Sequence, residues 1–385
     1  MDFSLTKEQT EICRLIREAS RKGLNESVFE DDEKSIFPMH KWRVCGDIGI
    51  HGLPVPGEYG GSGLDMLSTA LAIQNLSRTC KDEGLIFSIV AHICTVAVPL
   101  MNHGTDDQKR KYLPKIAKGE YIGGNAITES SAGSDPTGML TTVSKTDTAY
   151  TIEGAKIFVT NAPVSDLLIV YARHPKGMKM LDISAFIVEK GNPGLQIGQV
   201  FHKMGLRTSS MSEIVLSDCR VSPEALLGRE RWGMTVFNVS MFWERIIMSA
   251  YHIGAMAQQY EMALAYANSR KQFGQNIGQF SAVSDKLIDM KMRIETSKLL
   301  LYKTCWTYDK TGDINMADAS MVKLYVSDVR VKSSLDAVQL FGAYGYMKES
   351  DVEKQLRDSI ASKIYSGTSE IQKKIIAENL GRKND

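Results

Sequence analysis

The sequence predicts an α+β protein of three consecutive domains. These are an N-terminal helical domain over residues 1–121, an antiparallel β barrel or sandwich over 122–222, and a C-terminal four-helix bundle over 223–385. Three observations lead to this prediction. Apolar residues recur at helical spacing near the N-terminus, short runs rich in β-branched residues fill the middle, and helical spacing returns beyond Pro223 with few helix breakers.

The N-terminal region carries two capping boxes, in which a Thr and a Gln three residues later satisfy each other's backbone N–H groups. Thr6 with Gln9 predicts the start of one amphipathic helix, and Thr105 with Gln108 predicts the start of another. Between them, LPVPGEYGGSGLD at 53–65 concentrates Pro and Gly. We therefore expect helices interrupted by a long turn region.

The middle region consists of short strand-like runs separated by turn-like runs. The strand-like runs are YTIEG, KIFVT, DLLIVYAR, ISAFIVEK and SEIVLSDCRV, and the turn-like runs are GSDPTG, TNAP and GNPG. No helical pattern lies between the strands, so the sequence favours an antiparallel barrel or sandwich over a parallel sheet. The absence of GxGxxG also argues against a Rossmann-type domain.

The C-terminal region is predicted to contain three long helices, near residues 229–270, 280–310 and 316–342. The second helix has an apolar stripe formed by Val283, Leu287, Met290, Ile294 and Leu301. Several long helices in succession with few breakers are typical of a bundle.

Charge is almost balanced, with 46 basic and 45 acidic residues and a formal net charge of +1. This balance gives no global attraction to nucleic acid or to an anionic membrane, so we expect neither as a partner. The N-terminus, MDFSLTKEQ, lacks the apolar core of a signal peptide. No uncharged apolar run is expected to reach the length of a membrane span.

Cysteine and histidine spacing predicts neither a disulfide framework nor a metal site. The six cysteines lie far apart with no CxxC pair. The seven histidines fall in no HExxH or other ligand spacing. A reducing cytoplasm is therefore the expected location, and no metal is an expected cofactor.

Glu244 and Arg245 are the only formal charges between Arg231 and Glu261. They lie in VFNVSMFWERIIMSAYHIGA, residues 236–255, where the helical spacing of apolar residues indicates burial. A buried carboxylate is costly to ionise, and this cost raises its proton affinity toward the range of a general base. The alternative is an adjacent pair at a helix surface, with the two side chains pointing to different sides.

Four stretches, in order along the chain, resemble the acyl-CoA dehydrogenase family. They are AITESSAGSD at 126–135 with KIFVTN at 156–161, SRKQFGQNIGQF at 269–280, VQLFGAYGY at 338–346, and EKQLRDSIASKIYSGTSEIQ at 353–372. The resemblance covers essentially the whole chain. It implies an acyl-CoA dehydrogenase-like fold around FAD, a homotetramer or at least a homodimer, and α,β-dehydrogenation of an acyl thioester.

The resemblance also implies which residues bind FAD. The implied contacts are Ile127 and Thr128 along the flavin ring, Gly133 and Ser134 at the pyrophosphate, Phe158 beside the ring, Thr160 at its N5 edge, and Thr368 with Glu370. A second group consists of Arg270 at the pyrophosphate of a neighbouring subunit, Gln339 and Gly342 near its adenosine part, and Phe273 as a further cofactor contact. Without the resemblance, these residues would be ordinary turn, strand and surface residues.

Many family members place the catalytic glutamate directly after the Tyr of a YEGT motif, where this chain has YSGT at 365–368. A serine hydroxyl is too weak a base for proton abstraction without a partner. The isovaleryl-CoA and long-chain types instead carry the base on an earlier helix, directly before an arginine, and Glu244 with Arg245 matches that arrangement. The resemblance thus implies Glu244 as the base and the Ser366 backbone N–H as the carbonyl donor, with Glu370 as the competing carboxylate.

Family members that act on CoA thioesters typically carry an Asp two residues before this base, where the chain has Phe242. The segments GLRTSSMSE at 205–213, MFWERIIMSAYHIGAM at 241–256 and KIYSGTSEIQ at 363–372 resemble a subgroup that oxidises carrier-bound acyl groups, notably prolyl groups. The implied substrate contacts are Phe242, Trp243, Arg245 and Tyr365. Core packing is the alternative for the aromatic residues.

The leading hypothesis is an FAD-dependent dehydrogenase or oxidase of secondary metabolism. Its substrate would be an L-prolyl group on a peptidyl or acyl carrier protein, and its product a dehydroprolyl group, pyrroline or pyrrole. Glu244 would take the α-proton while hydride passes to the flavin N5. One alternative is a short- or branched-chain acyl-CoA dehydrogenase, and another, of a different class, is a non-catalytic flavoprotein scaffold.

Overall fold

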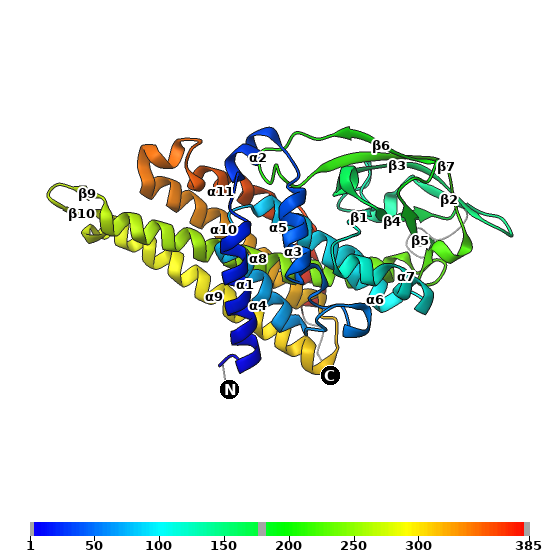
Figure 1. Ribbon diagram of the computed structural model, residues 1–385, viewed down its shortest axis with the longest axis horizontal. Coiled ribbons are helices and arrows are strands. Elements are labelled where there is room, and N and C mark those ends of the chain that lie inside the picture. Colours follow the sequence, from blue (N-terminus) through cyan, green and yellow to red (C-terminus); the bar gives the residue numbers. More distant parts are fainter. Residues whose placement is uncertain (1–3, 176–181, 381–385) are drawn as a thin grey trace.

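A computed structural model describes residues 4–175 and 182–380. A helical region, a β-sheet region and a second helical region follow one another along the chain, as the sequence predicts. The molecule is elongated, with the sheet at one end and the tip of two long helices at the other (Figure 1). The predicted α+β architecture is therefore confirmed.

The N-terminal region is helical, and both predicted capping boxes form at the starts of α1 and α7. Its helices are α1 (Lys7–Gly23), α2 (Val28–Lys34), α3 (Met39–Asp47), α4 (Met66–Thr79), α5 (Glu83–His92), α6 (Val98–His103) and α7 (Asp106–Ala117), with the short turns η1 (Ile50–Gly52) and η2 (Gly57–Tyr59) and a π-helical segment η3 (Ile93–Ala97). The predicted turn region lies between η1 and α4 and is irregular apart from the short turn η2.

A continuous apolar helix, Glu83–His103, combines α5, η3 and α6. It has 21 residues and a mean hydropathy of 2.1 in its most apolar window, so the prediction that no apolar run reaches the length of a membrane span was wrong. Within the protein, 94% of that window is buried. A central helix of a protein core has the same composition as a membrane span, because both are surrounded by apolar groups.

Over its described residues, the β-sheet region forms one sheet of eight strands. They are β1 (Gly123–Ala126), β2 (Thr142–Lys145), β3 (Tyr150–Thr160), β4 (Leu167–Arg173), β5 (Ile183–Glu189), β6 (Leu195–Val200), β7 (Met211–Val221) and β8 (Leu226–Leu227). Most neighbours are antiparallel, but β1 and β2 each pair with β4 in parallel. The sequence pattern did not predict these parallel pairs, which the long connections from β1 and β2 to β4 allow. The last strand, β8, lies beyond residue 222 and pairs with β5.

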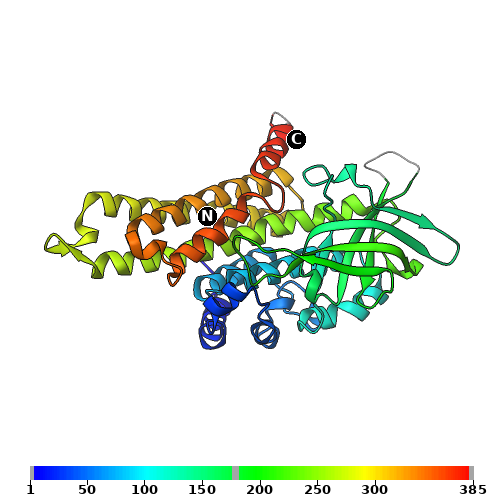
Figure 2. The same cartoon turned by 90° about the horizontal axis from the view of Figure 1, so that it is seen from above.

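Up to residue 380, the C-terminal region contains the three long predicted helices and two shorter ones. They are α8 (Gly233–Ser269), α9 (Ser281–Thr311), α10 (Met316–Phe341), α11 (Asp351–Ile360) and α12 (Ser369–Asn379), with a small hairpin of β9 (Lys271–Gln272) and β10 (Gln275–Asn276) between α8 and α9. Short helical turns are η4 (Pro136–Gly138), η5 (Ala162–Val164), η6 (Pro223–Ala225), η7 (Ile277–Gln279), η8 (Gly342–Tyr346) and η9 (Ala361–Lys363). Figure 2 shows α12 projecting from one side of the bundle.

The loop between β6 and β7 ties the three regions together through buried polar contacts. The Leu206 N–H donates to Asp358 on α11 at 2.5 Å, and the Thr208 hydroxyl donates to Asp82 at 2.5 Å. Asp82 also pairs with Lys41 on α3 at 3.3 Å. Charge-assisted bonds of this kind fix a loop because an unpaired buried charge is costly.

Candidate active site

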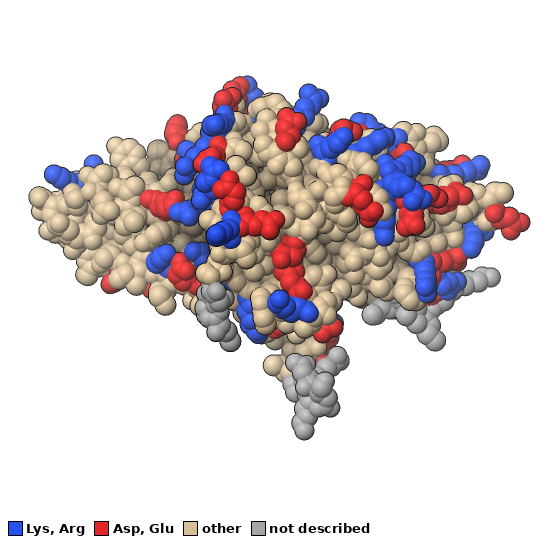
Figure 3. All heavy atoms as spheres, turned by 60° about the horizontal axis from the view of Figure 1, so that its bottom comes forward, with Lys and Arg blue, Asp and Glu red and all other residues tan. Residues whose placement is uncertain are grey.

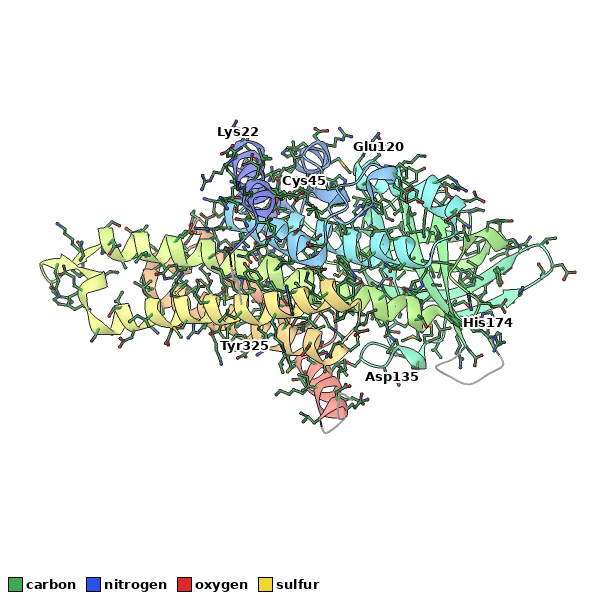
Figure 4. The ribbon with its side chains drawn as sticks, turned by 90° about the horizontal axis from the view of Figure 1, so that it is seen from below. Lys22, Cys45, Glu120, Asp135, His174 and Tyr325 are labelled. Carbon is green, nitrogen blue, oxygen red and sulfur yellow. The ribbon has the colours of Figure 1, made fainter. Side chains whose placement is uncertain are left out.

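A cavity of about 1570 Å³ lies where the three regions meet. Its walls come from α5 and η3, the loop after β1, the end of β3, the β6–β7 loop, α8, the start of α10, and the segment from α11 to α12. Asp135, between the lining residues Ser134 and Pro136, lies on the side of the β-sheet region that faces α12 (Figure 4). A cavity of this size can hold a large cofactor together with a substrate.

Glu244 lies on α8, lines this cavity and is 7% exposed. Burial raises the pKa of its carboxyl to about 7, against the smaller opposing effects of the Ser366 hydroxyl, Arg245 and Lys323. A base is most effective when its pKa lies near the operating pH. Since Arg245 is buried as well, the pair does not lie at a helix surface.

Ser366 and Gly367 lie in a turn between α11 and α12 that also lines the cavity. Both have left-handed backbone conformations, with φ of 54° and 88°. The Ser366 carbonyl accepts a hydrogen bond from Arg245 Nε at 3.2 Å. Its hydroxyl oxygen is buried and has no hydrogen-bond partner of good geometry among the described residues. The turn therefore places a serine side chain and a fixed backbone beside the buried carboxylate.

The predicted flavin contacts from the β-sheet region come together along one side of the cavity. Those that line it are Ile127, Thr128, Gly133, Ser134, Phe158 and Thr160. Phe158 is 56% exposed and has a left-handed φ of 55°, which is strained for a bulky residue. The Asn125 Oδ1, also at the cavity, is buried without a hydrogen-bond partner in the described part of the chain. An exposed aromatic ring, hydroxyls and an unpaired amide oxygen suit a planar cofactor with polar edges.

The second group of predicted cofactor residues lies elsewhere. Arg270, Phe273, Gln339 and Gly342 are at the ends of α8 and α10 and in the β9–β10 hairpin, and none lines the cavity. Phe273 is 94% exposed. Figure 3 shows acidic and basic side chains intermixed over the visible face, with few charges at the tip of the long helices. Contact of this group with the FAD of a neighbouring subunit stays a prediction.

Two of the four predicted substrate contacts line the cavity and two do not. Arg245 and Tyr365 line it. Phe242 and Trp243 instead pack against Tyr308 on α9, with ring centroids 5.1 and 6.0 Å apart. Successive residues of a helix point about 100° apart, so the two positions before the carboxylate face another neighbour. The structure places these two aromatic rings in the core, which was the alternative to a substrate contact.

The remaining predicted residues lie at the start of α12. Thr368 lines the cavity, and its hydroxyl accepts from the Ile371 N–H at 3.4 Å, which caps the helix. Glu370 is exposed, and hydrogen bonding to its own backbone N–H and to the Thr368 hydroxyl lowers the pKa of its carboxyl. A carboxylate with a lowered pKa is a weaker base, so the competing carboxylate is less suited to proton abstraction than Glu244.

Several cavity residues had not been predicted from the sequence. Phe87, Ala91 and Thr95 line the wall formed by α5 and η3, and the Thr95 hydroxyl donates to the Ala91 carbonyl at 2.7 Å. π-Helical segments such as η3 frequently occur at functional sites. Lys323 and Gln372, which contact the Ser366–Gly367 turn, were also missed. A signal for Lys323 exists, because it is a lone charge in the apolar run ASMVKLYVS.

Comparison with protein families gives matches over most of the chain. The model of the acyl-CoA dehydrogenase N-terminal domain matches residues 6–120, that of the middle domain residues 124–219, and that of the C-terminal domain residues 231–381. A curated relative from Serratia sp., an L-prolyl (peptidyl-carrier protein) dehydrogenase, is 39% identical over 381 residues, which covers 99% of this chain and 98% of the relative.

Two solved structures are similar over nearly their whole length. The prolyl acyl carrier protein oxidase AnaB is 41% identical with a TM-score of 0.96, and the match covers 98% of this chain and 100% of that chain. PigA, solved with FAD and proline, is 39% identical with a TM-score of 0.96, and the match covers 99% of both chains.

Proposed function

Because the chain belongs to the acyl-CoA dehydrogenase family, whose members are FAD-dependent oxidoreductases, we propose that it dehydrogenates an L-prolyl group held as a thioester on a carrier protein. The product would be a dehydroprolyl group. The observation that carries the proposal is Glu244, a buried carboxylate with a pKa of about 7 in the wall of the large cavity. The similarity to AnaB and PigA supports the choice of substrate.

The residues along the β-sheet side of the cavity fit FAD and would hold it. Ile127, Thr128, Phe158 and Thr160 would contact the ring, and Gly133 with Ser134 would contact the pyrophosphate. When bound, FAD supplies the acceptor for the hydride that leaves the carbon next to the α-carbon. The predicted contacts at Arg270, Phe273, Gln339 and Gly342 would come from a neighbouring subunit, which requires at least a dimer.

Glu244 would remove the α-proton of the prolyl group, and the proton would stay on its carboxylate oxygen. Loss of that proton shifts negative charge onto the thioester oxygen. The Ser366 backbone N–H would donate to this oxygen and so stabilise the charge as it develops. The apolar side chains of Phe87 and Ala91 would exclude water from the reacting atoms.

Tyr365 and Phe87 support a small acyl group. Their ring centroids lie 4.8 Å apart, and both side chains line the cavity. The Tyr365 hydroxyl is held by His252 Nε2 at 2.5 Å. An aromatic pair fixed in this way limits the space next to Glu244 and suits a five-membered ring better than a long acyl chain.

The test uses FAD-loaded protein under anaerobic conditions with carrier protein loaded with L-proline. We expect the flavin absorbance to bleach and the intact mass of the loaded carrier to fall by one or two hydrogen pairs. Parallel reactions contain free L-proline, isovaleryl-CoA or butyryl-CoA. Bleaching by a CoA thioester without any mass change on the carrier would favour the short- or branched-chain alternative. No bleaching by any thioester would favour a non-catalytic flavoprotein scaffold.

A further inference from the structure

We propose that Lys323 is a positioning residue for the thioester carbonyl, because its ammonium group holds the Ser366–Gly367 turn in the conformation that leaves the Ser366 N–H free for that carbonyl. The inference rests on the proposed function only in naming a thioester carbonyl as the acceptor. Its structural part, that Lys323 holds the turn, stands on the contacts of the turn itself.

The turn has a conformation that its own sequence does not favour. Ser366 has φ of 54°, in the left-handed region where a side chain with a Cβ is strained. Gly367 follows with φ of 88°, which glycine adopts freely. A strained residue at a ligand site persists only where the surrounding structure determines it. Contacts outside the turn must therefore hold Ser366 in place.

Three buried side chains from three helices supply these contacts. Lys323 Nζ on α10 donates to the Gly367 carbonyl at 2.7 Å. Gln372 Nε2 on α12 donates to the same carbonyl at 2.7 Å and to the Ser366 carbonyl at 3.0 Å, and Arg245 on α8 donates to the latter at 3.2 Å. With both carbonyls fixed, the peptide planes that follow Ser366 and Gly367 are fixed, and the left-handed φ of Ser366 then sets the direction of its own N–H relative to them.

Unlike these two carbonyls, the Ser366 N–H is not satisfied by a side chain or backbone group of the described residues. Within residues 4–175 and 182–380 it has no acceptor of good hydrogen-bond geometry, although Ser366 lines the cavity. Backbone N–H groups away from water are nearly always paired. The turn thus satisfies its acceptors with protein side chains and leaves this donor for a ligand, as a preorganised carbonyl site requires.

Burying the charged Lys323 side chain costs more free energy than a purely structural contact would require. Its side chain is buried, 3% exposed, and its ammonium donates to a neutral carbonyl rather than to a carboxylate. Burial, followed by the charge of Arg245, lowers the pKa of Lys323 to about 7, and the smaller effects of Glu244 and Glu370 oppose this shift. In return, its charge lowers the pKa of the Glu244 carboxyl. Lys323 therefore affects both the base and the carbonyl donor.

The test compares Lys323→Met with Lys332→Met, a matched control at an exposed position of the same helix. In FAD-loaded protein, Lys323→Met should lower the maximal rate of flavin reduction by roughly 10- to 100-fold, with little change in the Kd of the loaded carrier, because misplacement affects the transition state most. Lys332→Met should match the wild type. An unchanged maximal rate in Lys323→Met, or an equal loss in the control, would overturn the proposal.

A second variant separates geometry from charge. Lys323→Gln keeps a donor for the Gly367 carbonyl but removes the charge, so its maximal rate should exceed that of Lys323→Met. In both variants the acid limb of the pH–rate profile should move to higher pH, because the pKa of Glu244 rises when a nearby cation is removed. A role confined to packing would leave that limb unmoved, and such a result would count against the proposal.

Crystal structures of FAD-loaded wild type and Lys323→Met decide the structural part without any substrate. We expect the Ser366 φ to leave the left-handed region in the variant. A turn that keeps its left-handed conformation would overturn the positioning role. If no thioester bleaches the wild-type flavin, the proposed function fails, while the two crystal structures still decide whether Lys323 holds the turn.

Discussion

Arg330 on α10 donates to Glu83 on α5 at 2.7 Å, and both side chains are buried. Tyr251 on α8 donates to the other oxygen of the same carboxylate at 2.6 Å. Burial raises the pKa of Glu83, and the opposing effect of Arg330 is the largest that favours its charged form. One carboxylate thus joins α5 of the N-terminal region to α8 and α10 of the C-terminal bundle.

Removing one partner of this ion pair should destabilise the protein strongly. Arg330→Met leaves Glu83 without its main counter-charge, and we expect a loss of about 3–5 kcal/mol in the free energy of unfolding. The double variant with Glu83→Gln should lose less than Arg330→Met alone, as measured by urea unfolding of FAD-free protein. Arg14→Met at an exposed pair serves as the control and should change little. Equal losses in the single and double variants would contradict the coupling.

Glu244→Gln should abolish proton abstraction while leaving the cavity intact. The amide has nearly the same shape but cannot accept the α-proton, so the rate of anaerobic flavin reduction by the loaded carrier should fall by several orders of magnitude. Glu261→Gln, an exposed position of the same helix, should keep the wild-type rate. FAD content should be equal in both variants. A wild-type rate in Glu244→Gln would assign the base to another group.

The pH dependence of flavin reduction should report the raised pKa of Glu244. Proton abstraction needs the ionised carboxylate, so the rate at low substrate concentration should rise with pH through about 7 and level off above it. Stopped-flow absorbance at the flavin band over a range of buffers measures this profile. An acid limb below pH ~5 would instead indicate a carboxylate with an ordinary or lowered pKa, such as Glu370.

Substitutions of Phe158 should weaken FAD binding. Their effect on the stability of the FAD-free protein should depend on whether the new residue relieves the backbone strain. Phe158→Gly removes the ring and also the left-handed strain, and Phe158→Ala removes the ring but keeps the strain. Both variants should bind FAD more weakly, by about tenfold, which corresponds to a lost aromatic contact of about 1.4 kcal/mol. The FAD-free Gly variant should be more stable than the Ala variant by about 1 kcal/mol. Equal stabilities would show that the backbone at this position is not strained.

Local signals predicted most of the helices and strands. The capping boxes at Thr6 and Thr105 depend on residues three positions apart, and both form as expected. The parallel pairing of β1 and β2 with β4 was missed, because strand pairing depends on residues far apart in the chain. The apolar run from α5 to α6 was predicted to be too short to span a membrane, and its 21 residues show that it is long enough. Its burial identifies it as a core helix, a distinction that composition alone does not make.

The site prediction began with one residue that is unusual in its surroundings, and the family resemblance supplied the others. Glu244 was found because it interrupts an apolar run, and the structure buries it at the cavity. Phe242 and Trp243 were expected at the substrate from the family resemblance and their aromatic bulk, yet both rings pack against Tyr308, because adjacent residues of a helix face different neighbours. Lys323 and Gln372 donate to backbone carbonyls, and such contacts leave no motif in a sequence. The only signal for Lys323 was its position as a lone charge in an apolar run, and Gln372 had none.

The contacts around the cavity join residues that lie far apart in the sequence, and this has a consequence for folding. The bond from Arg245 to Ser366 closes a loop of 121 residues, and the bond from Leu206 to Asp358 closes one of 152. Contacts between such distant residues form late, because the entropy of loop closure is lost before they contribute any stability. We therefore expect the cofactor site to be completed in the last folding steps. Added FAD should then raise the population of the finished fold by mass action without accelerating the steps that precede it.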